Sequence, residues 1–169
     1  MAKKDDSSKK KVHGRKANAP APAPAEGATL EDLLAGLNVD LAREYSAVIL
    51  YRTYASQVSG QWRMELRQFF EAEIPDELGH AQLLADKIVA LGGTPTTVPS
   101  PVKTADNPRQ MLKNALADEI EALGRYVLRR SQAEALGHYG LAVALDDLIR
   151  DESGHRDEIE MILKRWDGK

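Results

Sequence analysis

The 169-residue sequence contains no cysteine, and that absence excludes disulfide bonds and every metal centre built on thiolates. Any metal that this chain binds must therefore be held by histidine and carboxylate side chains. Long apolar runs are also missing: no stretch approaches the roughly 18 residues that a membrane-spanning helix needs, so we expect no membrane partner. The Lys-rich beginning lacks the apolar segment of a secretory signal, which makes a cytoplasmic location the expectation.

Charge is distributed unevenly along the chain. Residues 1–29 hold seven Lys and Arg against three Asp and Glu, a net charge of +4, whereas the remainder holds 16 against 23, a net charge of −7. Residues 1–29 are charged at first and then alternate Pro with Ala, which predicts a disordered arm on a semi-rigid spacer. We expect residues 30–169 to form a single domain behind this arm.

Apolar residues recur at helical spacing along the acidic body and predict four α-helices. Thr29 is the expected N-cap of the first helix. The proline-rich residues 92–108 cannot be helical throughout, so they form a long connection. These features predict an all-α fold, an antiparallel four-helix bundle with one long crossover between the second and third helices. The predicted helices cover approximately residues 30–59, 61–91, 108–136 and 141–166.

A five-residue pattern occurs twice in the chain. Residues 76–80 read DELGH, and residues 151–155, 75 positions later, read DESGH. Two halves with one layout predict a pair of helical hairpins related by a pseudo-twofold axis. The same offset of 75 relates two further pairs of residues, Glu44 with Glu119 and Tyr51 with Tyr126.

The spacing within each pattern indicates a metal site. A Glu and a His three positions apart lie on one face of a helix and can hold one metal ion together. Two such helices, with one further Glu from each antiparallel partner, supply four carboxylates whose charges neutralise two divalent ions. A single Glu-x-x-His is usually a solvated pair, but four carboxylates buried without metal would be very unfavourable. The predicted ligands are Glu44, Glu77, His80, Glu119, Glu152 and His155.

With this ligand spacing, much of residues 30–166 resembles bacterioferritin and its Dps-like and rubrerythrin relatives. The resemblance implies a ferroxidase that holds two iron ions per subunit at the six ligands, with manganese as an alternative metal. It would oxidise Fe(II) with O2 or H2O2 for iron storage or detoxification in a hollow homo-oligomeric shell. The resemblance also implies two catalytic tyrosines, Tyr51 at the position of the bacterioferritin tyrosine and Tyr126 at that of the second rubrerythrin tyrosine. A plain role in the core stays open for both.

The sequence departs from these relatives in three respects. Leu78 stands where bacterioferritin carries the Met that ligates haem, so no haem is expected. Only 14 residues follow His155, without the fifth helix of 24-subunit cages, which favours a shell of 12 subunits over one of 24. The cysteine pair of the Dps-like archaeal proteins with an intrasubunit site is also absent.

Two other functions stay open at this point. One is a di-iron peroxidase of the rubrerythrin type, although Ala122 stands where rubrerythrins hold a further Glu. The other is a non-enzymatic, nucleoid-associated shell in which residues 1–29 bind DNA. That arm has no aromatic residue to stack on bases, so its binding would neutralise phosphates without regard to sequence. A hollow shell would favour storage, and a dimer would favour the peroxidase.

Overall fold

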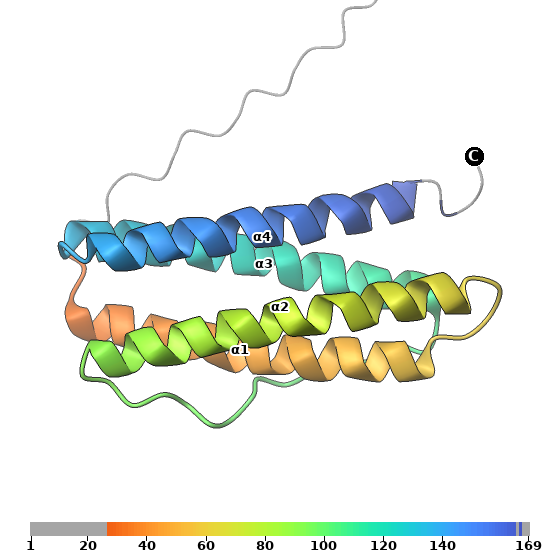
Figure 1. Cartoon of the computed structure of the whole chain (residues 1–169), viewed down its shortest axis with the longest axis horizontal. Helices are drawn as coiled ribbons and strands as arrows, with labels where there is room; N and C mark the ends of the chain where they lie inside the picture. Colours follow the sequence, from red (N-terminus) through yellow and green to blue (C-terminus); the bar gives the residue numbers. More distant parts are fainter. Residues whose placement is uncertain (1–26, 165, 167–169) are drawn as a thin grey trace, which may run out of the picture.

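The computed structural model describes residues 27–164 and Trp166, which form four α-helices and, within that part of the chain, no strand (Figure 1). The predicted all-α four-helix architecture is confirmed, and each helix ends within two residues of its expected position. All but the last three residues of the predicted basic arm lie outside the described residues. The helices are α1 (Leu30–Gln57), α2 (Arg63–Ala90), α3 (Pro108–Ala135) and α4 (Tyr139–Lys164).

Local sequence signals fix the beginnings of two helices. Thr29 caps α1 as expected: its hydroxyl accepts a hydrogen bond from the Asp32 amide at 3.1 Å, and the Asp32 side chain bonds back to Thr29. Asn107 caps α3, where its side-chain oxygen accepts from the Gln110 amide at 2.9 Å. Pro108 takes the first helical position, where its missing N–H costs nothing. These caps set the start of each hairpin and hence the register of its site residues.

The bundle consists of two helical hairpins, α1–α2 and α3–α4, whose helices pack most closely within each hairpin. In Figure 1 the predicted long crossover leaves the end of α2 and runs along the outside of the α1–α2 hairpin before it reaches α3. It is tied to the middle of α1, because the Ser100 amide donates to the Ala42 carbonyl at 2.9 Å. The Ser46 hydroxyl also donates to the Ser100 carbonyl at 2.7 Å. In the described part of the chain, none of the helices combines the length and apolar character that crossing a membrane would require.

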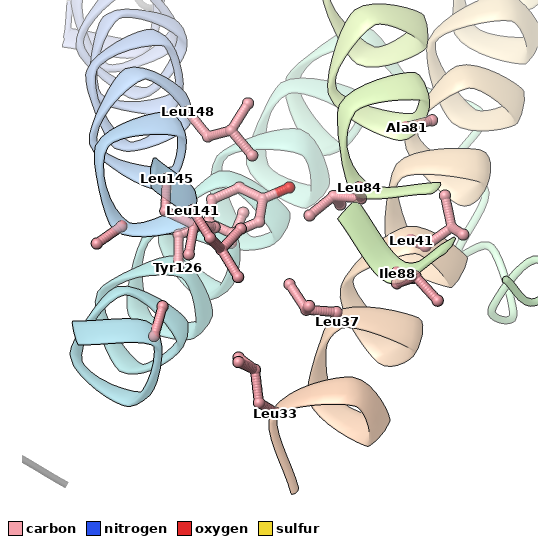
Figure 2. Close-up of a cluster of buried hydrophobic side chains, with 13 residues drawn as sticks. Leu33, Leu37, Leu41, Ala81, Leu84, Ile88, Tyr126, Leu141, Leu145 and Leu148 are labelled. Atoms are coloured by element: carbon pink, nitrogen blue, oxygen red, sulfur yellow. The ribbon is translucent and has the colours of Figure 1, made fainter. Parts of the chain in front are cut away.

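Two apolar clusters fill the bundle, one toward each end. The first gathers side chains of all four helices, among them Leu37 of α1, Leu84 of α2 and Leu145 of α4 (Figure 2). The second is built around Tyr54 and Phe70. Between the two clusters lies a layer of buried polar and charged side chains. These are Asp40, Glu44, Ser46, Glu73, Glu77, His80, Glu119 and Glu152.

Candidate metal centre

Six carboxylate and imidazole side chains from all four helices meet in the layer between the apolar clusters. Five of them are buried, and the sixth, His155, exposes only 11% of its side chain. Their ligand atoms form two groups, and within each group the atoms lie within 4.8 Å of one another. The first group is Glu44, Glu77, His80 and Glu152, and the second is Glu77, Glu119, Glu152 and His155.

Two carboxylates belong to both groups. Glu77 of α2 and Glu152 of α4 are shared, whereas Glu44 and Glu119 each belong to one group. The shared carboxylates therefore lie where they can bridge two cations. All six residues that the sequence singled out are brought together, three from each hairpin.

Both imidazoles turn Nδ1 toward the carboxylates. Nδ1 of His80 lies 3.2 Å from Glu152 and 3.6 Å from both Glu44 and Glu77. Nδ1 of His155 lies 3.2 Å from the other oxygen of Glu152. In each half, Nδ1 is the nitrogen that would coordinate a cation, and it faces the carboxylates that would coordinate the same cation.

The two tyrosines that the sequence singled out lie beside the centre. Tyr51 donates a hydrogen bond to Glu119, and Tyr126 donates one to Glu44, so each ties α1 to α3 at an unshared carboxylate. Burial, together with the neighbouring carboxylates, raises the pKa of both hydroxyls well above the usual value. Both tyrosines therefore stay protonated and hold their carboxylates in place, an arrangement that suits a positioning role as well as electron donation.

Burial governs where protons reside in the centre. It raises the pKa of Glu77 and, with a contribution from neighbouring carboxylates, that of Glu119. Burial also raises the pKa of Glu152, but the two imidazoles beside it outweigh this effect and bring that pKa below its ordinary value. For His80, burial lowers the pKa, and the neighbouring carboxylates of Glu152, Glu44 and Glu77 outweigh this effect and raise the pKa above its ordinary value. Excess negative charge is therefore partly neutralised by protons, which a metal ion would replace.

Two buried atoms of the centre lack a hydrogen-bond partner among the described residues: Oε2 of Glu44 and Nδ1 of His80. Buried polar atoms are nearly always paired, because an unpaired one costs about 1–3 kcal/mol. Both atoms belong to the same four-residue group, and a divalent cation would give each of them a partner. Carboxylate oxygens and imidazole nitrogens without thiolates suit ions such as Fe(II) and Mn(II). The residues present therefore fit a pair of divalent ions.

An outer pair of aspartates faces the imidazoles from the opposite side. Asp151 lies 3.6 Å from Nε2 of His80, and Asp76 lies 3.5 Å from Nε2 of His155. Each aspartate thus approaches the imidazole of the other hairpin. The sequence shows an Asp before each Glu-x-x-His, but this crosswise pairing depends on how α2 packs against α4 and is visible only in the structure.

The centre opens toward the crossover, on the side formed by α1 and α3. The cavity on this side reaches all four glutamates of the centre directly, so a small molecule can approach them from here. Two arginines and one aspartate also line it, which gives the cavity charges of both signs. Its lining includes Glu44, Glu77, Glu119, Glu152, Arg43, Asp118, Arg125, Pro101 and Val102.

A further buried acid, Asp40, lies one turn before Glu44 and was not singled out from the sequence. Its two oxygens accept hydrogen bonds from Nε of Arg125 at 2.9 Å and from Nε of Arg129 at 3.1 Å. Gly36 makes room for this contact, because a Cβ there would lie 2.1 Å from the Arg129 side chain. The cluster joins α1 to α3 beside the centre and thereby supports the placement of Glu44.

Comparison with known proteins agrees with this geometry. The family model described as "Ferritin-like domain" matches residues 34–168. A solved ferritin-like, diiron-carboxylate protein from Bacillus anthracis str. Ames is 49% identical, with a TM-score of 0.78, over 79% of this chain and 96% of that chain. Bacterioferritin from Brucella melitensis biotype 1 is 30% identical over 129 residues, 75% of this chain and 80% of its own length. The Rhodobacter capsulatus bacterioferritin structure, which has a metal-free dinuclear site and haem iron, is 26% identical with a TM-score of 0.71, over 81% of this chain and 86% of that chain. The resemblance inferred from the ligand spacing is confirmed: this chain belongs to the ferritin-like family.

Proposed function

We propose that this protein is a ferroxidase that binds two Fe(II) ions as substrate at the six-residue centre and oxidises them to Fe(III) with O2 or H2O2. The observation that carries this proposal is that the two ligand groups share Glu77 and Glu152. Two ions held by shared carboxylates can both pass an electron to one oxidant molecule. Two Fe(II) supply two electrons, which with two protons convert one H2O2 to two waters, or one O2 to one H2O2.

The side chains of the centre would have three roles: metal ligand, electron donor and positioning residue. The six proposed ligands are Glu44, Glu77, His80, Glu119, Glu152 and His155, and burial keeps water from competing for them. Tyr51 is the proposed electron donor for an oxidant that needs a further electron, and its proton would pass to Glu119, which already accepts its hydrogen bond. Tyr126 would hold Glu44 through the matching hydrogen bond.

Relatives named for bacterioferritin and for a diiron-carboxylate centre support iron as the metal, with manganese as the alternative. We also propose that the chain assembles into an iron-storing shell, of 12 subunits in preference to 24. In support, several large apolar side chains are exposed on the single chain and would be covered at contacts between subunits. They include Val39, Ile49, Leu78, Ile120 and Leu128. Measuring the mass of the purified particle tests this, and a dimer would favour the peroxidase of the rubrerythrin type.

Absence of haem is also part of the proposal. Leu78 is about half exposed on α2 and offers no sulfur lone pair to an iron ion. The protein reconstituted with haem should therefore show no absorption band of a Met-ligated haem. Such a band would overturn this part of the proposal without touching the ferroxidase.

The ferroxidase is tested by comparing the wild type with Glu77→Ala and with the control Glu71→Ala. Glu71 lies on the same helix but exposes 40% of its side chain and pairs with Arg67 at 3.0 Å, away from the centre. The wild type and the control should bind two metal ions per chain and oxidise Fe(II) faster than buffer alone, and Glu77→Ala should do neither while remaining helical. Full activity of Glu77→Ala would overturn the assignment.

A further inference from the structure

The two halves of the centre repeat the six proposed ligands, but they differ at a buried position one turn before a repeated glutamate. The offset of 75 that relates the ligand pairs also relates Asp76 to Asp151, but it relates Glu73 to Leu148. Both of these last side chains are buried, with 9% of Glu73 and 3% of Leu148 exposed. One half therefore carries a buried carboxylate where the other half carries an apolar side chain.

That extra carboxylate faces a proposed ligand. Oε2 of Glu73, on α2, lies 3.2 Å from Nε2 of His155, on α4. The same oxygen has no hydrogen bond of good geometry among the described residues. A buried carboxylate oxygen without a donor is costly, and the donor within reach is an N–H at Nε2 of His155.

The imidazole of the other half, His80, has a weaker contact at its outer nitrogen. Among the carboxylates of the described residues, Asp151 is the one that faces Nε2 of His80, at 3.6 Å, and its side chain is 51% exposed. His155 has the matching exposed partner, Asp76, at 3.5 Å with 61% exposed. Exposed carboxylates are solvated by water and hold an imidazole loosely, so the buried Glu73 is what distinguishes the two halves.

A carboxylate behind a metal-binding imidazole has a known physical effect. It accepts the N–H of the outer ring nitrogen, which fixes the tautomer and the ring orientation and makes the inner nitrogen a stronger donor. In this chain the inner nitrogen is Nδ1 of His155, which already faces Glu152 at 3.2 Å.

We propose that Glu73 is a positioning residue that makes the two metal positions unequal. It holds His155 with its proton on Nε2 and its Nδ1 lone pair directed at the cation. The group that contains His155 therefore binds the first divalent cation, and the group that contains His80 binds the second, more weakly. This inference depends on the proposed two-metal centre and adds the order in which the two cations bind.

The test titrates Co(II) into the metal-free full-length protein and follows the visible absorption of the bound ion. Glu73→Leu copies the residue of the other half and should weaken the tighter of the two binding steps by about 10–100-fold, the usual effect of losing such an outer carboxylate. Glu73→Gln keeps an acceptor without the charge and should give an intermediate loss. Glu71→Gln removes a partly exposed charge two residues away, and it should leave both binding steps unchanged.

Two backgrounds separate positioning from a general effect on packing. In His80→Ala, only the His155 half keeps its imidazole, and Glu73→Leu should weaken Co(II) binding there by the same factor. In His155→Ala, the side chain that Glu73 positions is gone, and Glu73→Leu should change nothing. Equal losses in both backgrounds would overturn the proposal. If Glu73→Leu does not fold, as judged by circular dichroism, the Gln variant in the same two backgrounds decides the question.

Failure of this inference is distinguishable from failure of the proposed function. A wild-type protein that binds fewer than two Co(II) ions per chain would refute the two-metal centre itself. A wild type that binds two ions, with Glu73→Leu and Glu73→Gln both binding them as tightly, would refute only the role of Glu73.

Discussion

Replacing a shared carboxylate should harm the centre more than replacing an unshared one. Glu152 belongs to both ligand groups and lies 3.2 Å from Nδ1 of His80 and from Nδ1 of His155. Glu44 belongs to one group only. We therefore expect Glu152→Ala to weaken both metal positions, and Glu44→Ala to weaken chiefly the position that contains His80.

The size of the effect follows from the charges. Four carboxylates balance two divalent cations, so a centre with three carboxylates and two cations carries one uncompensated positive charge. Leaving one charge of a buried pair without its partner costs about 3–5 kcal/mol. With about 1.4 kcal/mol for each tenfold change in affinity, the second cation should bind about 100- to 4,000-fold more weakly. At an iron concentration that just fills both positions of the wild type, the Glu152→Ala variant would then hold no pair of ions.

Two measurements check this expectation. Equilibrium dialysis should find two tightly bound ions per chain in the wild type, at most one in Glu44→Ala, and none or one weakly bound ion in Glu152→Ala. Stopped-flow absorbance should show the fast phase of Fe(II) oxidation only in the wild type and in the surface control Glu71→Ala. Two tight ions in Glu152→Ala, or identical affinity losses in the Glu44 and Glu152 variants, would refute the distinction between shared and unshared carboxylates.

Three further predictions follow from the same geometry. Burial raises the pKa of Glu77 and Glu119, so metal binding must displace their protons. The affinity for metal ions should therefore rise with pH, and titration with metal in weakly buffered solution should show protons released. A metal affinity that is independent of pH would contradict this. After addition of H2O2 to the Fe(II)-loaded protein, a tyrosyl radical signal in electron paramagnetic resonance should disappear in Tyr51→Phe and persist in Tyr126→Phe; the reverse would exchange their roles. Retardation of DNA by the protein in a gel should weaken steeply with salt and vanish when residues 1–26 are deleted. This truncation keeps the Thr29 cap and should leave Fe(II) oxidation intact. Unchanged retardation by the truncated protein would show that the arm is not the contact.

The bundle and the six residues of the centre were predictable from the sequence for one physical reason. Helices impose a fixed spacing on residues that share a face, and an internal repeat shows that spacing twice. The Glu-x-x-His patterns put Glu77 beside His80 and Glu152 beside His155 whatever the details of packing. The antiparallel hairpins then require a partner glutamate at a matching height, 33 residues upstream in each half. Helical periodicity and the antiparallel direction of the two helices in each hairpin were therefore sufficient to predict which residues meet at the centre.

The surroundings of the centre could not be predicted in the same way, because they depend on the rotation of each helix about its axis. Asp40 could have been assigned to the solvent side of α1, yet it is fully buried between two arginines of α3. The crosswise contacts of Asp76 and Asp151 with the opposite imidazoles depend on how closely α2 approaches α4. Glu73 lies one turn before a proposed ligand, and the sequence alone is equally compatible with an exposed or a buried side chain at this position.

The pseudo-twofold symmetry of the centre does not extend to every buried residue around it, and this has consequences for the two tyrosines. By the offset of 75, the buried Asp40 of one half corresponds to Ala115 of the other. The charge of Asp40 is one of the causes that raise the pKa of Tyr126, after burial and the nearer carboxylates. For Tyr51 the corresponding additional charge is that of Glu73, and the ring of Phe70 lies at a centroid distance of 6.2 Å. Both hydroxyls donate to a glutamate in the same way, but the surrounding charges differ and an aromatic ring lies beside Tyr51, and these differences affect the loss of an electron. Identical hydrogen bonds in a repeated layout therefore do not make the two tyrosines equivalent, and single replacements of each are needed to assign the donor.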